Sequence, residues 1–293
     1  QNGIAGLKKR AGEKVLLLDY MEERQQYYIK RGSRSYAQTV KNCGEYCQAY
    51  KGKNIRLSQI NKDYVTGFIG YLDDSKLGAG TIYTYYNALM IVINSAVREG
   101  LIAENPAKYV DPKMKPKQKE SSRDFLTMDE LRQLTLTPCA AGTLKKAFLF
   151  SCFTGLRVSD ICVIRVEDVV EVDKGKYQIQ LQQTKTKVMV FIPLSDNALK
   201  WMPKKKSGLL FPDIPPSPTR ERKLAEWSAA AGIKKHVTFH VARHTYATLL
   251  LTYGADIYTV SQLLGHKNLE TTQIYAKIID KKKRETVDLI PQL

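Results

Sequence analysis

LLGHKNLETTQIY, residues 263–275, is the stretch around which the rest of the sequence is organised. It places His266 nine residues ahead of Tyr275. Three short basic clusters lie upstream of it: TGLR with Arg157, QTKTK with Lys185, and HVARH with His240 and Arg243. If the fold brings these clusters together, cationic side chains and histidines will surround one tyrosine hydroxyl.

The net charge sets this chain apart from an average globular protein. Its 293 residues carry 46 Lys and Arg against 29 Asp and Glu, a net charge of +17. Residues 1–120 contribute 20 − 12 = +8 and residues 121–293 contribute 26 − 17 = +9. An excess spread over both halves is expected if both lie against one polyanion, and a generally basic soluble protein is the alternative.

The cysteines indicate a reducing compartment. There are five, an odd number whose spacing fits no disulfide framework. Cys43 and Cys47 lie one helical turn apart, but no further Cys or His pair nearby completes a zinc site, so we expect buried thiols. No apolar run approaches the roughly 18–20 residues that span a bilayer, and no signal peptide is visible.

The first part of the chain predicts an all-α domain. Residues 1–11 form a flexible lead-in, and residues 12–110 hold four segments with apolar residues at helical spacing. Ser58 is the expected cap of the third helix. The expected helices cover residues 14–29, 36–50, 58–72 and 81–100.

Residues 111–123, DPKMKPKQKESSR, predict a linker because they combine two prolines with a run of lysines. Such a run is usually only solvated. Between two basic domains it is also suited to crossing a DNA backbone, and the candidate contacts are Lys115, Lys117, Lys119 and Arg123.

Residues 124–293 predict a second, mainly helical domain with a small β component. Thr127 and Glu130 form a capping box at the start of a helix. Residues 176–192 alternate apolar and polar residues on both sides of QTKT, which predicts a β-hairpin with Lys185 at its turn. Further helices are expected at residues 142–153, 220–231, 241–253, 256–264 and 270–279.

The basic clusters suit phosphate better than metal. HVARH has histidines four residues apart, as zinc motifs do, but it lacks the glutamate base that accompanies them. His240 and Arg243 lie three residues apart and should share a helix face, while His244 is expected to point elsewhere. Arg157 follows a glycine break at a helix start, where it can present its guanidinium to a phosphate or pair with Asp160.

These residue types match the chemistry of breaking a phosphodiester without metal or ATP. Two arginines hold the non-bridging oxygens, on which charge develops in the transition state. Histidines add hydrogen-bond donors and can move protons, and a lysine can protonate the leaving oxygen. A tyrosine hydroxyl can attack the phosphorus and hold the phosphoryl group covalently.

At these motifs the chain resembles the tyrosine recombinase (phage integrase) family, and in particular integrases of Bacteroidetes conjugative and mobile elements. The resemblance covers about residues 12–290. It is strongest in TGLRVSD (154–160), HVARHTYAT (240–248) and LLGHKNLETTQIY (263–275), together with Lys185 eight residues before Pro193.

The resemblance implies a role for each matched residue. Arg157 and Arg243 bind the phosphate, and Tyr275 is the nucleophile. Lys185 is the general acid, with Lys187 as its rival near the same turn. His240 and His266 donate hydrogen bonds to the phosphate and take part in proton transfer. Asp160 supports the two arginines without contacting the phosphate itself. No metal or other cofactor is implied.

The family pattern also implies the fold and the partners. Residues 12–110 would be a SAM-like core-binding domain and residues 124–293 a mixed α/β catalytic domain. The implied activity is site-specific recombination through a 3′-phosphotyrosine and a Holliday junction, performed by a homo-tetramer on double-stranded DNA, with accessory DNA-bending or excision factors as further partners. Without DNA a monomer or weak oligomer is expected, in the bacterial cytoplasm at the nucleoid.

Two alternative functions and one alternative docking mode remain at the level of sequence. A type IB topoisomerase shares the chemistry, and a catalytically silent DNA-binding protein shares the scaffold. The apolar end VDLIPQL, residues 287–293, resembles the segment that family members dock on a neighbouring subunit, although it can also dock on its own body. An arm-binding domain, which family integrases often carry, is expected to be absent or removed.

Overall fold

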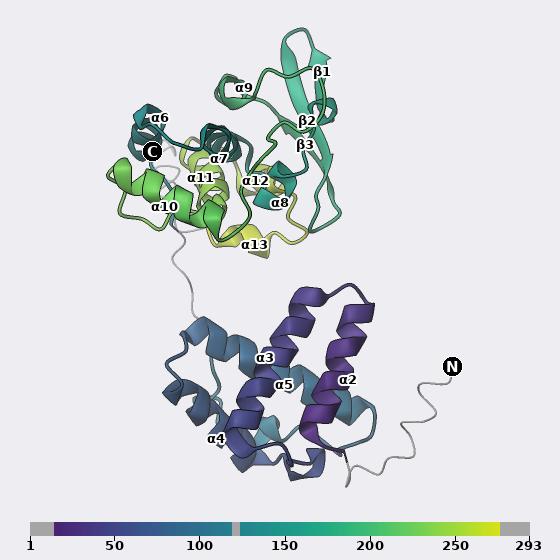
Figure 1. Ribbon diagram of the computed structural model, residues 1–293. Coiled ribbons are helices and arrows are strands. Elements are labelled where there is room, and N and C mark those ends of the chain that lie inside the picture. Colours follow the sequence, from purple (N-terminus) through teal and green to yellow (C-terminus); the bar gives the residue numbers. More distant parts are fainter. Residues whose placement is uncertain (1–14, 119–123, 276–293) are drawn as a thin grey trace, which may run out of the picture. The chain divides into compact units, whose positions relative to one another are not determined.

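The computed structural model describes residues 15–118 and 124–275. The chain divides into two compact units, residues 1–121 and 122–293 (Figure 1). The first unit is helical, and the second combines helices with one small sheet. The predicted fold class, mainly α with a small β component, is therefore confirmed. The predicted lead-in at residues 1–11 lies outside the described residues.

Over residues 15–118, the first unit is an all-α domain built on four helices. Its core is made of the apolar faces of these helices, and Tyr20, Phe68 and Leu89 are each fully buried in it. Cys43 and Cys47 are buried in the same core as free thiols. The helices are α2 (Leu17–Lys30), α3 (Arg34–Lys51), α4 (Lys62–Asp74) and α5 (Ala79–Arg98), with short 3₁₀ turns η1 (Leu57–Gln59) and η2 (Pro106–Tyr109).

The predicted N-cap of the third helix was wrong. Ser58 lies in the 3₁₀ turn η1 and does not cap α4. Asn61 takes that role, because its side-chain oxygen accepts a hydrogen bond from the backbone N–H of Tyr64 at 2.9 Å. Both residues are good N-caps, so composition alone could not choose between them.

The second unit is built around one helix whose C-terminal half is enclosed. Helix α7 (Gly142–Thr154) buries residues on every side, and it packs against α11 (Phe239–Thr252) and α9 (Asp196–Trp201). Phe148 at its centre meets the rings of Trp227 and Phe239 edge-on, at 5.8 and 5.6 Å between centroids. The remaining helices are α6 (Met128–Leu136), α8 (Val158–Ile161), α10 (Thr219–Ala230), α12 (Ile257–Leu264) and α13 (Glu270–Gln273), and a 3₁₀ turn η3 spans Val166–Asp168.

The sheet stands at one edge of this helical body (Figure 1). It has three antiparallel strands in the order β1 (Val169–Asp173), β2 (Lys176–Gln182) and β3 (Met189–Pro193). Strands β2 and β3 form the predicted hairpin, with Ile179 paired to Ile192 on the buried face. Strand β1 and helix α9 were not predicted, because β1 is a largely exposed edge strand and α9 is only six residues long.

The capping box predicted at Thr127 and Glu130 is present. The Thr127 hydroxyl accepts from the Glu130 N–H at 3.2 Å, and the Glu130 carboxylate accepts from the Thr127 N–H at 2.7 Å. Burial raises the pKa of Glu130, but hydrogen bonds from Lys235 and Thr127 outweigh it and hold this pKa below its usual value.

The predicted helix 270–279 is described only as far as residue 275, and its helical part ends at Gln273.

The two ends of α7 offer a matched test of this packing. Gly155 ends the helix with a φ of +70°, and a Cβ added there would lie 2.5 Å from the Tyr246 ring and 3.0 Å from Leu264. At Gly142, the first residue of the helix, an added Cβ meets nothing within 4 Å.

We expect Gly155→Ala to lower the free energy of unfolding of this unit by more than about 2 kcal/mol, because left-handed strain adds to the steric clash. Gly142→Ala should be neutral or stabilising by up to about 1 kcal/mol. Urea unfolding followed by circular dichroism measures both. Equal effects of the two substitutions would contradict the packing described here.

Candidate active site

Arg243 joins the ends of two helices. It lies on α11, and only 5% of it is exposed. Its Nη1 donates to the carbonyl of Gly155, just past the end of α7, and its Nη2 donates to the carbonyl of Leu264, the last residue of α12; both distances are 2.7 Å. Carbonyls at helix C-termini have no partner within the helix and carry partial negative charge, so a guanidinium is a favourable partner for them.

Arg157 is held beside it through a glutamine. Arg157 is the N-cap residue of α8, as its position after the glycine break predicted, and it is half-buried. Its Nη1 donates to Oε1 of Gln183 at 2.7 Å. The Nε2 of Gln183 donates at 3.0 Å to the Leu264 carbonyl that Arg243 also contacts. The two arginines therefore share one short chain of acceptors.

The pKa shifts indicate how the charges act on one another. Burial, and after it the positive charge of Arg157, lower the pKa of Arg243 to about 9, although Tyr275 and Asp160 oppose the shift. Burial also lowers the pKa of Arg157, against the opposing effect of Asp160. A guanidinium stays protonated near neutral pH. The shifts therefore report two adjacent positive charges that an anionic ligand would stabilise.

Asp160 connects the arginine loop to the β2–β3 turn. It is fully buried, and its Oδ1 accepts from the backbone N–H of Thr184 at 2.8 Å. Its Oδ2 is buried without a hydrogen-bond partner among the described residues. Asp160 thus acts on the arginines through its charge and on the turn through its hydrogen bond.

Lys185 and Lys187 are both exposed on this turn. Lys185 follows Thr184 directly, so Asp160 fixes the backbone next to it. Lys187 adopts a φ of +58°, and its N–H donates to the Gln183 carbonyl at 2.9 Å. Both lysines lie on the turn that Asp160 joins to the arginine loop, and the preference for Lys185 stays a prediction.

His266 and Tyr275 are connected through Thr272. The Nδ1 of His266 lies 2.8 Å from the Thr272 hydroxyl, and the N–H of Tyr275 donates to the Thr272 carbonyl at 3.0 Å. Thr272 is fully buried and Tyr275 is 5% exposed. The segment after α12 therefore folds back so that its histidine and its tyrosine are fixed by the same residue.

His244 contacts the tyrosine hydroxyl, so the expectation that it points elsewhere was wrong. Its Nδ1 lies 2.6 Å from Oη of Tyr275, and the two rings are 5.7 Å apart. His240 is exposed one turn earlier on α11, and its ring stacks on that of His244 at 6.5 Å. Because α11 is buried on most of its circumference, more than one of its faces meets functional residues.

Sequence reasoning missed Gln183 as well as His244. The β2 alternation contained a usable signal, because residue 183 has the same parity as the inward-facing Ile179 and Leu181. For His244 the signal was weaker: its spacing of four from His240 is as good a helix-face relation as the spacing of three from His240 to Arg243.

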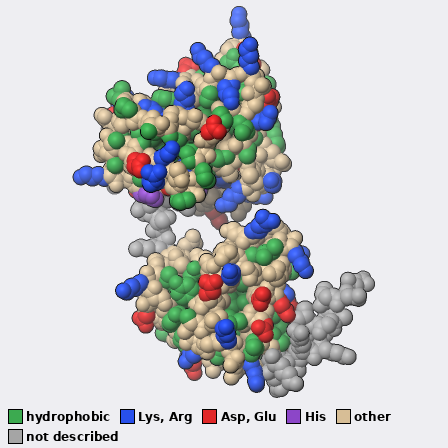
Figure 2. Space-filling view, viewed as in Figure 1, with side chains coloured by type: hydrophobic (Ala, Val, Ile, Leu, Met, Phe, Trp, Pro, Cys, Tyr) green, Lys and Arg blue, Asp and Glu red, His purple; other side chains and the backbone are tan. Residues whose placement is uncertain are grey.

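Two of the predicted DNA contacts, Lys119 and Arg123, lie outside the described residues. The apolar end at residues 287–293, predicted to dock on a subunit, lies outside them as well. Lys115 is half-buried and Lys117 is exposed, both at the end of the first unit. On the face drawn in Figure 2, Lys and Arg side chains are spread over both units and do not form a single patch.

Other features of the described part of the chain do not suggest a different site. Over residues 15–118 and 124–275, no group of three or more His, Cys, Asp or Glu side chains is placed to hold a metal ion, and no helix is long and apolar enough to cross a membrane.

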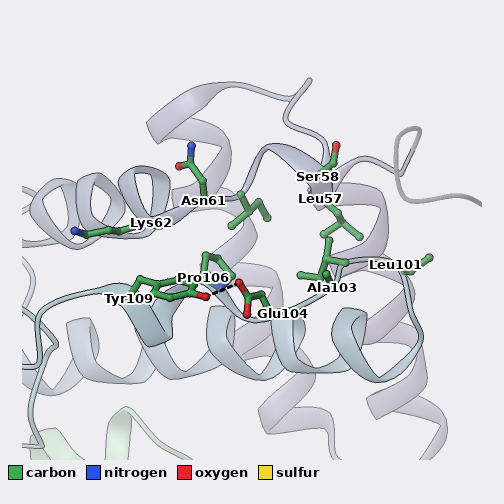
Figure 3. A pocket seen from close by; sticks show the side chains of 11 residues that line it. Leu57, Ser58, Asn61, Lys62, Leu101, Ala103, Glu104, Pro106 and Tyr109 are labelled. Carbon is green, nitrogen blue, oxygen red and sulfur yellow. Dashed lines mark hydrogen bonds between the residues drawn. The ribbon is translucent and has the colours of Figure 1, made fainter.

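A cavity of about 480 Å³ lies in the first unit between η1 and η2. Figure 3 shows Tyr109 and Glu104 beside it, joined by a hydrogen bond of 2.7 Å. None of the predicted catalytic residues lines this cavity.

Comparisons with known proteins identify the family. Residues 124–282 match the model of the phage integrase family, and residues 16–115 match that of the phage integrase SAM-like domain. The chain therefore belongs to the phage integrase family.

Individual relatives agree with this family. Tyrosine recombinase XerC of Bacillus subtilis is 32% identical over 228 residues, which are 72% of this chain and 74% of the relative. Among solved structures, a Tn1549 transposon integrase in complex with a circular intermediate DNA gives a TM-score of 0.71 at 14% identity, covering 92% of this chain and 99% of that one. A lambda integrase tetramer bound to a Holliday junction gives 0.68 at 21% identity, covering 92% and 82%.

If the arginines form a phosphate site, inorganic phosphate should stabilise the protein. We expect phosphate to raise the unfolding free energy by roughly 1.4 kcal/mol at about ten times its Kd, relative to chloride at equal ionic strength. Arg157→Met should abolish this difference, whereas Arg165→Met, at an exposed arginine paired with Glu167, should retain it. Thermal unfolding in the two salts measures it, and an undiminished phosphate effect in Arg157→Met would contradict the site.

Proposed function

We propose that this protein is a site-specific recombinase that cleaves and rejoins DNA strands with Tyr275 as the nucleophile. The observation that carries the proposal is the contact of 2.6 Å between Oη of Tyr275 and Nδ1 of His244, beside two arginines that share one network. A hydroxyl within hydrogen-bond distance of a base, next to fixed positive charge, is what attack on a phosphodiester requires.

The cleavage step transfers the phosphoryl group from the 5′ oxygen of the DNA to Tyr275. Oη of Tyr275 attacks the scissile phosphorus while Arg157 and Arg243 hold the non-bridging oxygens. The proton of Tyr275 passes to Nδ1 of His244, in the tautomer in which this nitrogen is the acceptor. The P–O5′ bond breaks, and Lys185 protonates the leaving 5′ oxygen.

The products are a 3′-phosphotyrosine and a 5′ hydroxyl, so the bond energy is retained without ATP or a metal ion. Religation runs the same step in reverse. The hydroxyl of a partner strand attacks the phosphorus, Lys185 takes its proton, and His244 returns a proton to the departing tyrosine oxygen. His240 and His266 are assigned as further hydrogen-bond donors to the phosphate.

The two units would divide the work on DNA. We assign residues 12–110 as the SAM-like core-binding domain, residues 111–123 as a basic linker along the backbone, and residues 124–293 as the catalytic domain. The positive charge of both halves supports this assignment, since each would then contact phosphates. Such binding weakens steeply as salt is raised, because it depends on the release of counterions.

The assembly we propose is a homo-tetramer that joins two duplexes through a Holliday junction. The lambda integrase tetramer on a Holliday junction has the same fold, which supports the proposal. Integration and excision of a mobile element, with accessory DNA-bending or excision factors, is the favoured role, in line with the fold shared with a transposon integrase. The reaction would take place on bacterial DNA in the cytoplasm, at the nucleoid.

A covalent-capture experiment on DNA of random sequence tests the nucleophile. The protein is incubated with a pool of nicked random duplexes, and detergent-resistant protein–DNA complexes are isolated and sequenced. We expect the intact protein to capture a distinct sequence and Tyr275→Phe to capture none. Tyr109→Phe, at an exposed tyrosine of the first unit, is the matched control and should capture DNA normally.

Covalent capture, combined with relaxation and strand-exchange assays on the captured sequence, separates the alternatives. A catalytically silent DNA-binding protein would retain DNA but form no covalent complex. A type IB topoisomerase would form the complex and relax supercoiled DNA without exchanging strands between two captured sites. Exchange between two such sites supports the recombinase, and a covalent complex that survives Tyr275→Phe would refute the assigned nucleophile.

The role of His244 leads to a separate prediction. His244→Ala should slow formation of the covalent complex by about 10²- to 10⁴-fold, the usual contribution of a positioned acid or base. Added imidazole should restore part of the rate, because it can enter the space left and accept the proton. His236→Ala, at an exposed histidine, should leave the rate unchanged. A normal rate in His244→Ala would exclude this histidine as the proton acceptor.

A further inference from the structure

Gln183 is a fully buried side chain that contacts three separate segments of the catalytic unit. Its Oε1 accepts from Nη1 of Arg157 and from the hydroxyl of Thr186, each at 2.7 Å. Its Nε2 donates to the carbonyl of Leu264 at 3.0 Å. One amide group thus touches the arginine loop, the β2–β3 turn and the end of α12.

These contacts form a ring that includes both arginines predicted to bind phosphate. Arg157 donates to Gln183, Gln183 donates to the Leu264 carbonyl, and Arg243 donates to the same carbonyl. The other end of the Arg243 guanidinium donates to the carbonyl of Gly155, two residues before Arg157. Removing the amide would open this ring between Arg157 and Leu264.

The backbone of Gln183 also holds the turn that carries Lys185. Its N–H donates to the Val188 carbonyl at 2.8 Å, and its carbonyl accepts from the Lys187 N–H at 2.9 Å. Together with the Thr186 contact, these bonds fix both sides of the residue that would serve as the general acid. The side chain that orients one arginine therefore begins the turn that presents the lysine.

The α12 end is shaped to receive this amide. Gly265 has a φ of +64°, and a Cβ added there would lie 2.8 Å from Nε2 and 2.9 Å from Oε1 of Gln183. Both features require glycine at this position: the left-handed backbone and the close approach of the amide. The glycine of the LGH motif and the glutamine are therefore complementary parts of one contact.

We propose that Gln183 is a positioning residue that sets the guanidinium of Arg157 and the turn bearing Lys185 in a single arrangement. Phosphate binding and protonation of the leaving oxygen are thereby coupled, since one side chain controls the groups that perform both. This inference rests on the proposed recombinase function.

The residue type fits this role. An amide supplies an acceptor to Arg157 and Thr186 and a donor to Leu264, which no carboxylate can do. It is also neutral, so it orients the guanidinium without neutralising the charge that the phosphate would meet. Because each guanidinium has five N–H donors, Arg157 keeps N–H groups to aim at a ligand after contacting Gln183.

The test uses two suicide duplexes of the sequence captured by the intact protein. They differ in one atom, the bridging atom on the 5′ side of the scissile phosphate, which is oxygen in one and sulfur in the other. A thiolate leaves without a proton, because a thiol is far more acidic than an alcohol, so the sulfur duplex does not require the general acid. Arginine defects slow cleavage of both duplexes, and lysine defects slow only the oxygen duplex.

Gln183→Met preserves volume and removes the three amide hydrogen bonds. We expect it to slow covalent-complex formation on the oxygen duplex by about 10- to 100-fold, the equivalent of one hydrogen bond to a charged group. The sulfur duplex should restore part of this loss, the part due to Lys185, but not the part due to Arg157. Gln180→Met, the same change on the outward side of β2, should behave like the intact protein on both duplexes.

Thr186 is half-buried, and Thr186→Val tests the contact between Gln183 and the β2–β3 turn by itself. It removes the hydroxyl contact to Gln183 without touching Arg157. We expect a smaller loss on the oxygen duplex that the sulfur duplex restores completely. A loss that sulfur leaves unchanged, or no loss at all, would overturn the proposed link between Gln183 and the turn.

Three outcomes for Gln183→Met would overturn the proposal: a normal rate on the oxygen duplex, complete restoration by sulfur, or no restoration. Thermal unfolding and DNA retention are measured for each variant, and the ratio of the two rates is insensitive to a loss of folded protein. If the intact protein itself forms no covalent complex, the proposed function fails. If the intact protein cleaves and the ratio is unchanged in Gln183→Met, only the positioning role fails.

Discussion

The catalytic unit depends on the two hydrogen bonds that the guanidinium of Arg243 donates. This guanidinium lies at the C-terminal ends of α7 and α12 at once and donates to a carbonyl of each at 2.7 Å. Two helix ends that approach each other would otherwise bury unsatisfied carbonyls of like partial charge, which is costly. A cation between them satisfies both, so the functional residue is also a structural connection between the two helices.

This arrangement constrains the backbone around it. Each helix ends in a left-handed glycine, Gly155 and Gly265, and at both an added Cβ would lie within 3.0 Å of a neighbouring side chain. The glycines turn the chain sharply, so that Arg157 follows one helix end and His266 follows the other within two residues. The short distance in sequence between glycine and functional residue is therefore a consequence of two helices ending at one point.

The sequence predicted the helices and strands better than the contacts between them. The capping box at Thr127 and the β2–β3 hairpin follow from local patterns, and both are present. The contact of His244 with Tyr275 depends on how α11 is rotated against a segment thirty-one residues away. Because α11 is buried on most sides, its sequence has no single polar face from which that rotation could be inferred.

The edge strand β1 was missed for the opposite reason. It is held by pairing with β2 and contributes little to the core, so its sequence has no inward alternation to detect. Gln183 is an intermediate case. Its parity along β2 indicated an inward position, but only the three-dimensional arrangement shows that the space it enters lies between Arg157 and the end of α12.

The charge balance of the site explains why neutral groups surround the arginines. Among the described residues, the direct hydrogen-bond acceptors of Arg157 and Arg243 are an amide and two carbonyls, and Asp160 is a carboxylate that moderates both pKa values. A carboxylate in place of Gln183 would stabilise the empty site more strongly, but it would compete with the phosphate for the same positive charge. Neutral acceptors orient the guanidinium groups and leave part of their desolvation uncompensated, and an incoming phosphodiester would relieve that cost.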